Sequence, residues 1–400
     1  MAIPKLALIP SGVKAGKLYS VLPTNGDGDF TTTRNTVATR VNENGLIEEV
    51  ASNVPRLDYS DGGCPSLLLE PLATNLILNH TGSSFSAFNG ASIVLNDSLS
   101  PDGGINSTKV VTSGSPNELV QESGLVIVSG QSYTISGYFK LKSGTLSSTN
   151  NDFKGLDGLT GSGLGFSTFN TINNTWQRLS FTATSSTASG RVQLKCEDSA
   201  EIIIWGLQVE SNSFATSLVK TIGTTQSRSA DTANGAGNAS TFNDSSGVLM
   251  AEVSTKDDGA NKFITLSDGT DDNRVTIYFY TSINNDIRFQ VRSNNINQPL
   301  TPMPSGYNID EFNKIAIKYK QNDISVYING FLVVSNVGNI DTPLNLSELA
   351  FDDGQGASDF YGNTKQLQYF DSALNDSDLE KLTSWTSFTA MANALKYTII

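Results

Sequence analysis

Hydrophobic and polar residues alternate along two long stretches of the chain, and this alternation predicts β-strands. In the first stretch, about residues 85–212, alternating runs such as SYTISGYFKLKSG (132–144) and EIIIWGLQVE (201–210) are separated by clusters of Gly, Asn and Ser. Runs of this spacing are typical of an antiparallel β-sandwich. The segment 145–162 is polar and rich in glycine, so it predicts a long exposed loop rather than a core strand.

The second alternating stretch runs from GVLMAEVST (247–255) through RVTIYFYTS (274–282) to TKQLQYFDSAL (364–374). It also predicts an all-β unit. Within it, the dipeptide Asn329-Gly330 separates two apolar runs and predicts a β-hairpin, because both residues tolerate the positive φ angles of a type I′ turn.

One short helix is predicted within DSALNDSDLEKLTS (371–384). Asn375 or Ser377 is suited to cap it, and acidic residues lie in its first turns, where they complement the helix dipole. Leu379 and Leu382 give it a narrow apolar face.

The first 80 residues lack regular alternation. Segment 46–75 neither alternates for long nor repeats at helical spacing, and Pro55, Pro65 and Pro71 exclude a continuous helix. A segment of this kind gains order only by lying on another surface, because alone it buries too little apolar area to offset chain entropy. We therefore expect residues 1–80 to be extended and to make most of their contacts with other chains.

The charge balance narrows the classes of partner. The chain has a net charge of -13, and its Lys and Arg residues form no cluster. Nucleic acid and anionic membrane are therefore not expected partners. No run of eighteen apolar residues predicts membrane insertion, and no secretion signal is recognised at the N-terminus, so synthesis in a cytoplasm is expected.

Two passages resemble sequences of virion proteins from tailed bacteriophages. The first comprises Arg34-Asn35, ATRVNENGLIEEVASNVPRLDY (38–59) and CPSLLLEPLATNL (64–76). The second, FATSLVKTIGTTQSRSAD (214–231), is similar to the passage that joins two domains in those proteins. The resemblance implies a structural virion protein, namely a tail or head fibre, spike or decoration subunit on the particle surface. Its implied partners are other virion proteins and further copies of itself, with a trimer expected.

The two alternating stretches also resemble known domains. IAIKYKQNDISVYINGFLV (315–333) and YGNTKQLQYFDSALNDSDLEKLTS (361–384) look like parts of a concanavalin A-like, laminin G-type domain. The upstream stretch, with WGLQVE (205–210), is similar to jelly-roll carbohydrate-binding modules. The predicted fold is all-β, with four parts: an anchoring segment (1–80), a carbohydrate-binding-module-like β-sandwich (81–220), a concanavalin A/laminin G-like β-sandwich (221–384) and a C-terminal tail (385–400).

Catalysis is not expected. A glycosidase needs two carboxyl groups that flank the scissile bond, and the adjacent pairs Glu48-Glu49 and Asp257-Asp258 would point to opposite faces of a strand. The single histidine, His80, is the only base available to a nucleophilic triad. It is more readily explained as a hydrogen-bonded structural residue.

Calcium is the one cofactor that the sequence suggests. The candidate ligands lie in SDGTDDN (267–273) and DDGQGASD (352–359), where carboxylates meet turn carbonyls, as laminin G-type domains imply. They are Asp268, Asp271, Asp352, Asp353 and Asp359. The alternative is that Asp and Gly simply favour turns.

Loop aromatic residues are the candidates for stacking against a host surface glycan. These are Tyr307, Phe360 and Tyr361. The sequence thus predicts a structural virion protein that docks by its N-terminal segment and contacts glycan through loops of its second β-sandwich. The alternative is a free carbohydrate-binding or polysaccharide-degrading protein.

Overall fold

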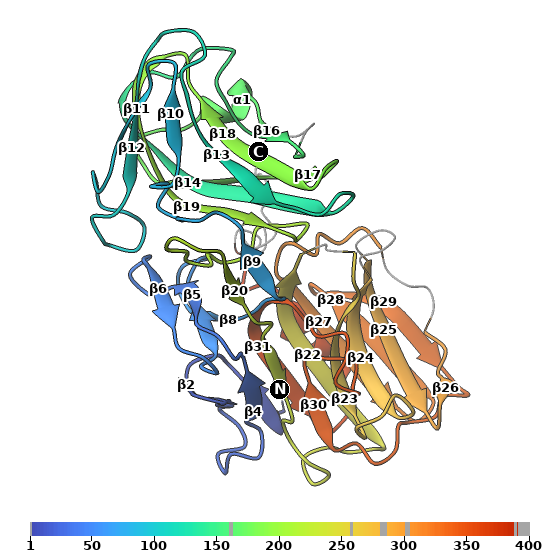
Figure 1. Cartoon of the computed structure of the whole chain (residues 1–400). Helices are drawn as coiled ribbons and strands as arrows, with labels where there is room; N and C mark the ends of the chain where they lie inside the picture. The colour runs from blue at the N-terminus through green and yellow to red at the C-terminus, as the bar shows by residue number, and fades with distance from the viewer. Residues whose placement is uncertain are drawn as a thin grey trace. The chain divides into compact units, whose positions relative to one another are not determined.

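The computed structural model describes residues 2–159, 163–256, 259–280, 286–300, 305–387 and 390. The chain divides into two units, both built from antiparallel sheets (Figure 1). Unit 1 consists of residues 1–35, 50–71 and 230–400, and unit 2 of residues 36–49 and 72–229. Within the described residues, no helix has both the length and the apolar character needed to cross a membrane.

Unit 1 contains a large and a small sheet. The large sheet has the order β29-β28-β27-β22-β31-β8-β7, with β1 also paired to β31, and the small sheet has the order β26-β25-β24-β23-β30. The large-sheet strands are β1 (Leu6–Leu8), β7 (Arg56–Asp58), β8 (Ser66–Leu69), β22 (Ser246–Thr255), β27 (Asn313–Lys320), β28 (Asp323–Ile328), β29 (Phe331–Val337) and β31 (Gly362–Phe370). The small-sheet strands are β23 (Lys262–Ser267), β24 (Arg274–Tyr280), β25 (Asp286–Ser293), β26 (Ile296–Asn297) and β30 (Glu348–Ala350).

Alternate residues of the two sheets form one core. Leu249 and Ile317 come from the large sheet, and Ile277 and Phe289 come from the small sheet; all four are at most 1% exposed. A separate four-stranded sheet belongs to the same unit, in the order β2 (Val13–Lys14), β3 (Lys17–Leu18), β4 (Phe30–Thr33) and β21 (Thr232–Asn234). Its Phe30 packs into the same core, so unit 1 is a β-sandwich that includes N-terminal strands.

The predicted helix is α2 (Asp376–Thr383), and the predicted hairpin also forms. The side chain of Asn375 caps α2 by accepting a hydrogen bond from the backbone N–H of Asp378. Leu379 packs in a small apolar cluster with residues of β22 and β31. Asn329 and Gly330 have φ angles of 52° and 90°, as a type I′ turn requires.

Unit 2 contains two five-stranded sheets. Their orders are β10-β13-β18-β15-β16 and β11-β12-β19-β14-β17. The first contains β10 (Ser86–Phe88), β13 (Leu119–Val126), β15 (Asp152–Asp157), β16 (Gly163–Leu164) and β18 (Ser189–Lys195). The second contains β11 (Ser92–Val94), β12 (Thr108–Ser113), β14 (Ser132–Gly144), β17 (Gln177–Thr184) and β19 (Ser199–Glu210). Residues of both sheets, among them Val120, Phe139, Leu194 and Ile202, share one core.

Smaller elements complete unit 2. Strand β9 (Ala73–Asn75) pairs with β20 (Gln226–Arg228), and β5 (Ala38–Val41) pairs with β6 (Ile47–Val50), whose last residue belongs to unit 1. Helix α1 (Phe166–Phe169) is a single turn. The predicted loop 145–162 is partly wrong, because residues 152–157 form β15. Phe153 of this strand is fully buried in the core of unit 2, and β15 pairs with β18.

The structure divides the chain differently from the predicted boundaries. Residues 1–80 do not form a separate segment: β1 and β8 both pair with β31, and Leu6, Leu67 and Leu69 are buried in the core of unit 1. Residues 36–49 and 72–80 belong to unit 2. The prediction of a separate extended segment is therefore wrong, and its contacts with other chains stay a prediction. Strands of two to four residues lack a readable period, and their partners lie far away in the sequence, as in the pairing of Leu6 with Tyr369.

Candidate functional site

The three aromatic residues predicted to stack on a glycan lie in different surroundings. Phe360 is fully buried, with its ring centroid 5.8 Å from that of Phe279, so the prediction that it binds a ligand is wrong. Tyr307 is half-buried against the same core. Tyr361 is half-buried and its hydroxyl donates to Asp359 at 3.1 Å. These residues do not form one platform.

Two of the predicted calcium ligands hold the turn between β23 and β24. Asp268 Oδ1 accepts from the backbone N–H of Thr270 at 2.9 Å, and Asp268 Oδ2 accepts from the side-chain amide of Asn273 at 2.9 Å. Asp271 forms an ion pair with Arg292, with 2.7 Å between Oδ2 and Nη1. These carboxylates therefore serve the turn.

The other three predicted ligands lie between β30 and β31. Asp352 accepts from the backbone N–H of Gly354 at 2.7 Å. Burial raises the pKa of Asp352 to about 6, and the nearby carboxylates of Asp353, Asp359 and Glu348 add to the rise. Across the described ranges, no three His, Cys, Asp or Glu side chains are grouped so as to hold a metal ion, and the predicted calcium site is not formed.

The small sheet of unit 1 presents a row-like arrangement of side chains on the face opposite its core side. We call this surface the aromatic face. Its residues lie in three cross-strand rows over β23, β24 and β25, which are neighbouring strands (Figure 1). The rows are Phe263–Tyr278–Arg288, Thr265–Thr276–Gln290 and Ser267–Arg274–Arg292. They follow from strand alternation, since Ile264, Leu266, Ile277 and Phe289 take the core positions.

Aromatic and cationic groups are fixed against one another in the first row and at Tyr280, which lies two residues beyond Tyr278 on β24. The rings of Phe263 and Tyr278 are stacked, with centroids 5.1 Å apart and planes 8° apart. The guanidinium carbon of Arg288 lies 4.2 Å from the ring centroid of Tyr280, a cation–π geometry. All four side chains are half-buried. The row is therefore both rigid and accessible.

The guanidinium groups of the third row are tied to neighbouring loops. Arg274 donates from Nε to the side-chain oxygen of Gln290 at 2.8 Å and from Nη1 to the backbone oxygen of Asp353 at 2.7 Å. Burial lowers the pKa of Arg274, and the positive charge of Arg292 lowers it further. Gln290 in turn donates to Asn297 at 2.8 Å. This side of the face is closed by hydrogen bonds.

Several buried polar atoms around the aromatic face make no hydrogen bond in the structure. They include the hydroxyl oxygens of Thr265 and Thr276, Nε of Arg288 and Oδ1 of Asp286. The two threonines are neighbours in register, and both are fully buried. Gly354 lies against Ser267 and Thr265, so this part of the face is covered by the chain itself.

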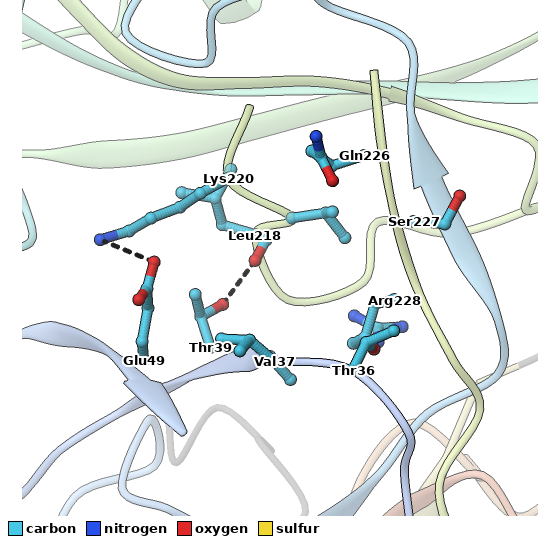
Figure 2. A pocket seen from close by; sticks show the side chains of 11 residues that line it. Thr36, Val37, Thr39, Glu49, Leu218, Lys220, Gln226, Ser227 and Arg228 are labelled. Carbon is cyan, nitrogen blue, oxygen red and sulfur yellow. Dashed lines mark hydrogen bonds and ion pairs between the residues drawn. The ribbon is translucent and has the colours of Figure 1, made fainter. Parts of the chain in front are cut away.

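Unit 2 contains a pocket of about 370 Å³ between β5, β20 and the segment 218–220 (Figure 2). Figure 2 shows the Lys220 amine directed at Glu49, 3.9 Å away, and the Thr39 hydroxyl directed at the backbone oxygen of Leu218, 2.6 Å away. Lys220 also pairs with Asp102 at 3.1 Å. Arg228, which also lines the pocket, donates to the hydroxyls of Thr216 and Ser217, so its guanidinium is engaged within the chain.

The two passages that resemble virion proteins contain the positions where the chain passes from one unit to the other. The chain passes from one unit to the other at residues 35/36, 49/50, 71/72 and 229/230, all within 34–76 and 214–231. Inside unit 1, the two passages meet in a buried charge cluster, which we define as Arg34, Arg56, Glu70 and Asp231. Asp231 pairs with both arginines, and Arg56 also pairs with Glu70 at 2.6 Å. The neighbouring carboxylates raise the pKa of Arg56 despite the opposing effect of burial.

The chain shows distant structural similarity to carbohydrate-binding β-sandwich modules. No protein-family model matches it, and no curated protein matches it. Among solved structures it is similar to the CBM40 module of the Ruminococcus gnavus IT-sialidase, solved with α2,3-sialyllactose, at 16% identity over 38% of this chain and 88% of that chain, with a TM-score of 0.30. It is also similar to domain 4 of AbnA, a GH43 extracellular arabinanase from Geobacillus stearothermophilus, at 15% identity over 39% of this chain and 73% of that chain, with a TM-score of 0.30.

The residues of the aromatic face were not among the sequence candidates. The polar and aromatic positions in RVTIYFY alternate with Val275, Ile277 and Phe279, so their shared face is readable from the sequence. The pairing of Phe263 with Tyr278 depends on strand register, which the polar turn 268–273 alone does not specify.

Proposed function

We propose that this chain is a structural subunit of a tailed-bacteriophage particle, a fibre, spike or decoration protein, that contacts glycan on the host surface. The observation that carries the proposal is the resemblance of residues 34–76 and 214–231 to virion proteins. Its support is the position of these passages, which contain all four connections between the units and supply the buried charge cluster. The passages that resemble virion proteins therefore contribute both to the connections between the units and to the core of unit 1.

Docking on the particle is proposed to use the exposed side of the N-terminal region rather than a free segment. Among residues 2–80, several large apolar side chains are exposed, including Ile3 at 82%, Leu72 at 59% and Val37 at 53%. Exposed apolar side chains next to well-ordered backbone are suited to bind other virion proteins or further copies of this chain. A homotrimer is part of the proposal.

The test is quantitative mass spectrometry of particles purified from a lysate of the host that carries this gene. The proposal predicts that the chain co-purifies with the particles at a copy number comparable to other structural subunits. Replacing Leu72 with Asp should reduce incorporation, whereas Lys256→Ala, at a side chain 52% exposed, should leave it unchanged. A chain found only free in the lysate, with none on particles, would favour the free carbohydrate-binding protein instead.

A further inference from the structure

We infer that the aromatic face of unit 1 is the glycan-binding site and that its ligand is a pyranose of a surface polysaccharide. The inference rests on the proposed glycan contact and gives it a location. It places the contact on the strand face of β23, β24 and β25 rather than on the loop aromatics Tyr307 and Tyr361. Three features of the face carry the inference: its aromatic pair, its hydrogen-bonding groups and its rigidity.

The aromatic pair supplies the apolar contact that a sugar needs. A pyranose has one side of C–H groups, and these pack favourably against the electron-rich surface of an aromatic ring. Phe263 and Tyr278 hold two parallel rings together on adjacent strands, and both side chains remain half-exposed. Because the rings are stacked, each covers one face of the other, and an outer ring face together with the ring edges remains for a sugar unit.

Polar groups next to the pair match the hydroxyls at the edge of a sugar. Arg288 lies in register with Tyr278 on the next strand, and its planar guanidinium presents donors in a fixed fork. Its Nε makes no hydrogen bond in the structure, and Oδ1 of Asp286, whose residue is 5% exposed, makes none either. Both atoms are buried, so the donors within reach of a sugar hydroxyl are those of the partly exposed remainder of the Arg288 guanidinium.

The remaining charges near the face argue for recognition by hydroxyls rather than by a carboxylate. Arg292 is paired with Asp271 at 2.7 Å, and Arg274 donates to Gln290 and to a backbone oxygen. The guanidinium of Arg288 has Asp286 at 3.5 Å. Each cation on the face thus has a nearby acceptor, so a neutral sugar is sufficient as ligand.

The face is rigid before any ligand binds. Its residues lie on three paired strands, and the ring stack and the cation–π contact fix the side chains further. Side chains that are already ordered lose little entropy on binding, which favours weak ligands such as sugars. A strand face is also a more exact scaffold than a loop.

The test uses the full chain on an array of immobilised hexose, N-acetylhexosamine and uronic acid oligosaccharides, followed by calorimetry with the best oligosaccharide. We expect binding to a neutral oligosaccharide, and an affinity at least about tenfold lower for Tyr278→Ala and for Arg288→Ala. Tyr278→Phe keeps the ring and should bind within about threefold of the native chain. Phe88→Ala removes an exposed aromatic side chain from a strand in unit 2 and is the matched control.

The thermal midpoint of each variant separates lost binding from lost folding. Two outcomes overturn the inference: no neutral oligosaccharide binds, or Tyr278→Ala and Arg288→Ala bind as the native chain does. Loss of affinity in Phe88→Ala alone would move the site to unit 2. None of these results changes particle incorporation, so a failure of this inference is distinguishable from a failure of the proposed function.

Discussion

Two five-stranded sheets, one in each unit, have outward faces with the same antiparallel geometry and different chemistry. The aromatic face of unit 1 carries a stacked ring pair beside Arg288. The corresponding face of β13, β18 and β15 in unit 2 carries the row Gln121–Gln193–Lys154. The lysines on that face are paired within it or at its edge, Lys154 with Asp152 at 2.6 Å and Lys195 with Glu197 at 2.7 Å.

The difference teaches that a sandwich face is made into a site by its side chains and not by its fold. On the face of unit 2, Lys154 and Lys195 pair with neighbouring carboxylates, and Oδ1 of Asp152 makes no hydrogen bond. On the face of unit 1, the stacked rings of Phe263 and Tyr278 lie in one row with Arg288, and the other two rows are polar. The ring pair is therefore what distinguishes this face from the row Gln121–Gln193–Lys154.

The two units also hold the N-terminal region in different ways. Unit 1 uses the buried charge cluster, whereas unit 2 uses neutral hydrogen bonds from Asn75, which is fully buried. The Asn75 amide donates to the backbone oxygens of Leu207 and Val219, both at 3.0 Å. Removing one member of the buried charge cluster leaves a buried charge with fewer partners. Removing Asn75 leaves uncharged polar groups without their hydrogen bonds.

The largest expected effect is therefore in unit 1. Arg56→Ala leaves Glu70 without its cation and Asp231 with one of two, and it should lower the unfolding free energy of unit 1 by about 3–5 kcal/mol. The measurement is native-state hydrogen exchange of β8 and β31. Lys256→Ala, which breaks an exposed pair with Asp310, is the control and should cost under about 1 kcal/mol. Equal effects of Arg56→Ala and Lys256→Ala would contradict the larger contribution to stability that is expected of the buried charge cluster.

The next expected effect is a loss of stability as the pH rises, and its cause is the buried carboxyl group of Asp352. The pKa of Asp352 is about 6 in the folded chain, whereas the ordinary value for an aspartate is 3.8. The folded state therefore binds this proton more tightly than the unfolded state does. Stability should therefore fall as pH rises from about 4 to about 6, by up to about 3 kcal/mol. Asp352→Asn should remove this fall and keep the hydrogen bond from Gly354. Thermal unfolding at pH 4 and pH 7 measures it, and an equal effect of the substitution at both pH values would refute the shift.

A smaller effect is expected in unit 2. Asn75→Ala removes four hydrogen bonds, two donated to the backbone oxygens of Leu207 and Val219 and two accepted from the backbone N–H groups of Ile77 and Val209, which should cost at least about 2 kcal/mol. Denaturant unfolding of unit 2, followed by the fluorescence of the buried Trp205, measures the change. Its neighbour Thr74, which is half-buried and whose hydroxyl lies 2.7 Å from that of Ser227, is the control, and Thr74→Ala should cost under about 1 kcal/mol.

The smallest effect is expected on the outward face of unit 2. Lys154→Ala breaks a surface pair with Asp152 and should change stability by under about 0.5 kcal/mol. Its affinity for the array oligosaccharide should equal that of the native chain. A clear loss of affinity in this variant would show that the two faces are not as different as their side chains indicate.

Much of the fold is predictable from the sequence, and most of the site is not. The alternation of 132–144 and 201–210 correctly predicts β14 and β19, and the cap at Asn375 is correct because capping is a local interaction. Pairing of β1 and β8 with β31 is not readable, since it joins residues as distant in the sequence as Leu6 and Tyr369, or Leu69 and Gly362. Phe360 follows a glycine-rich turn without alternation, so its burial depends on the packing of unit 1.

The central comparison is tested most directly by hydrogen exchange of the full chain with and without the oligosaccharide that binds best on the array. The account predicts added protection in peptides that cover β23, β24 and β25, with no change in those that cover β13, β15 and β18. Added protection in β13, β15 and β18, with β23 to β25 unchanged, would contradict it.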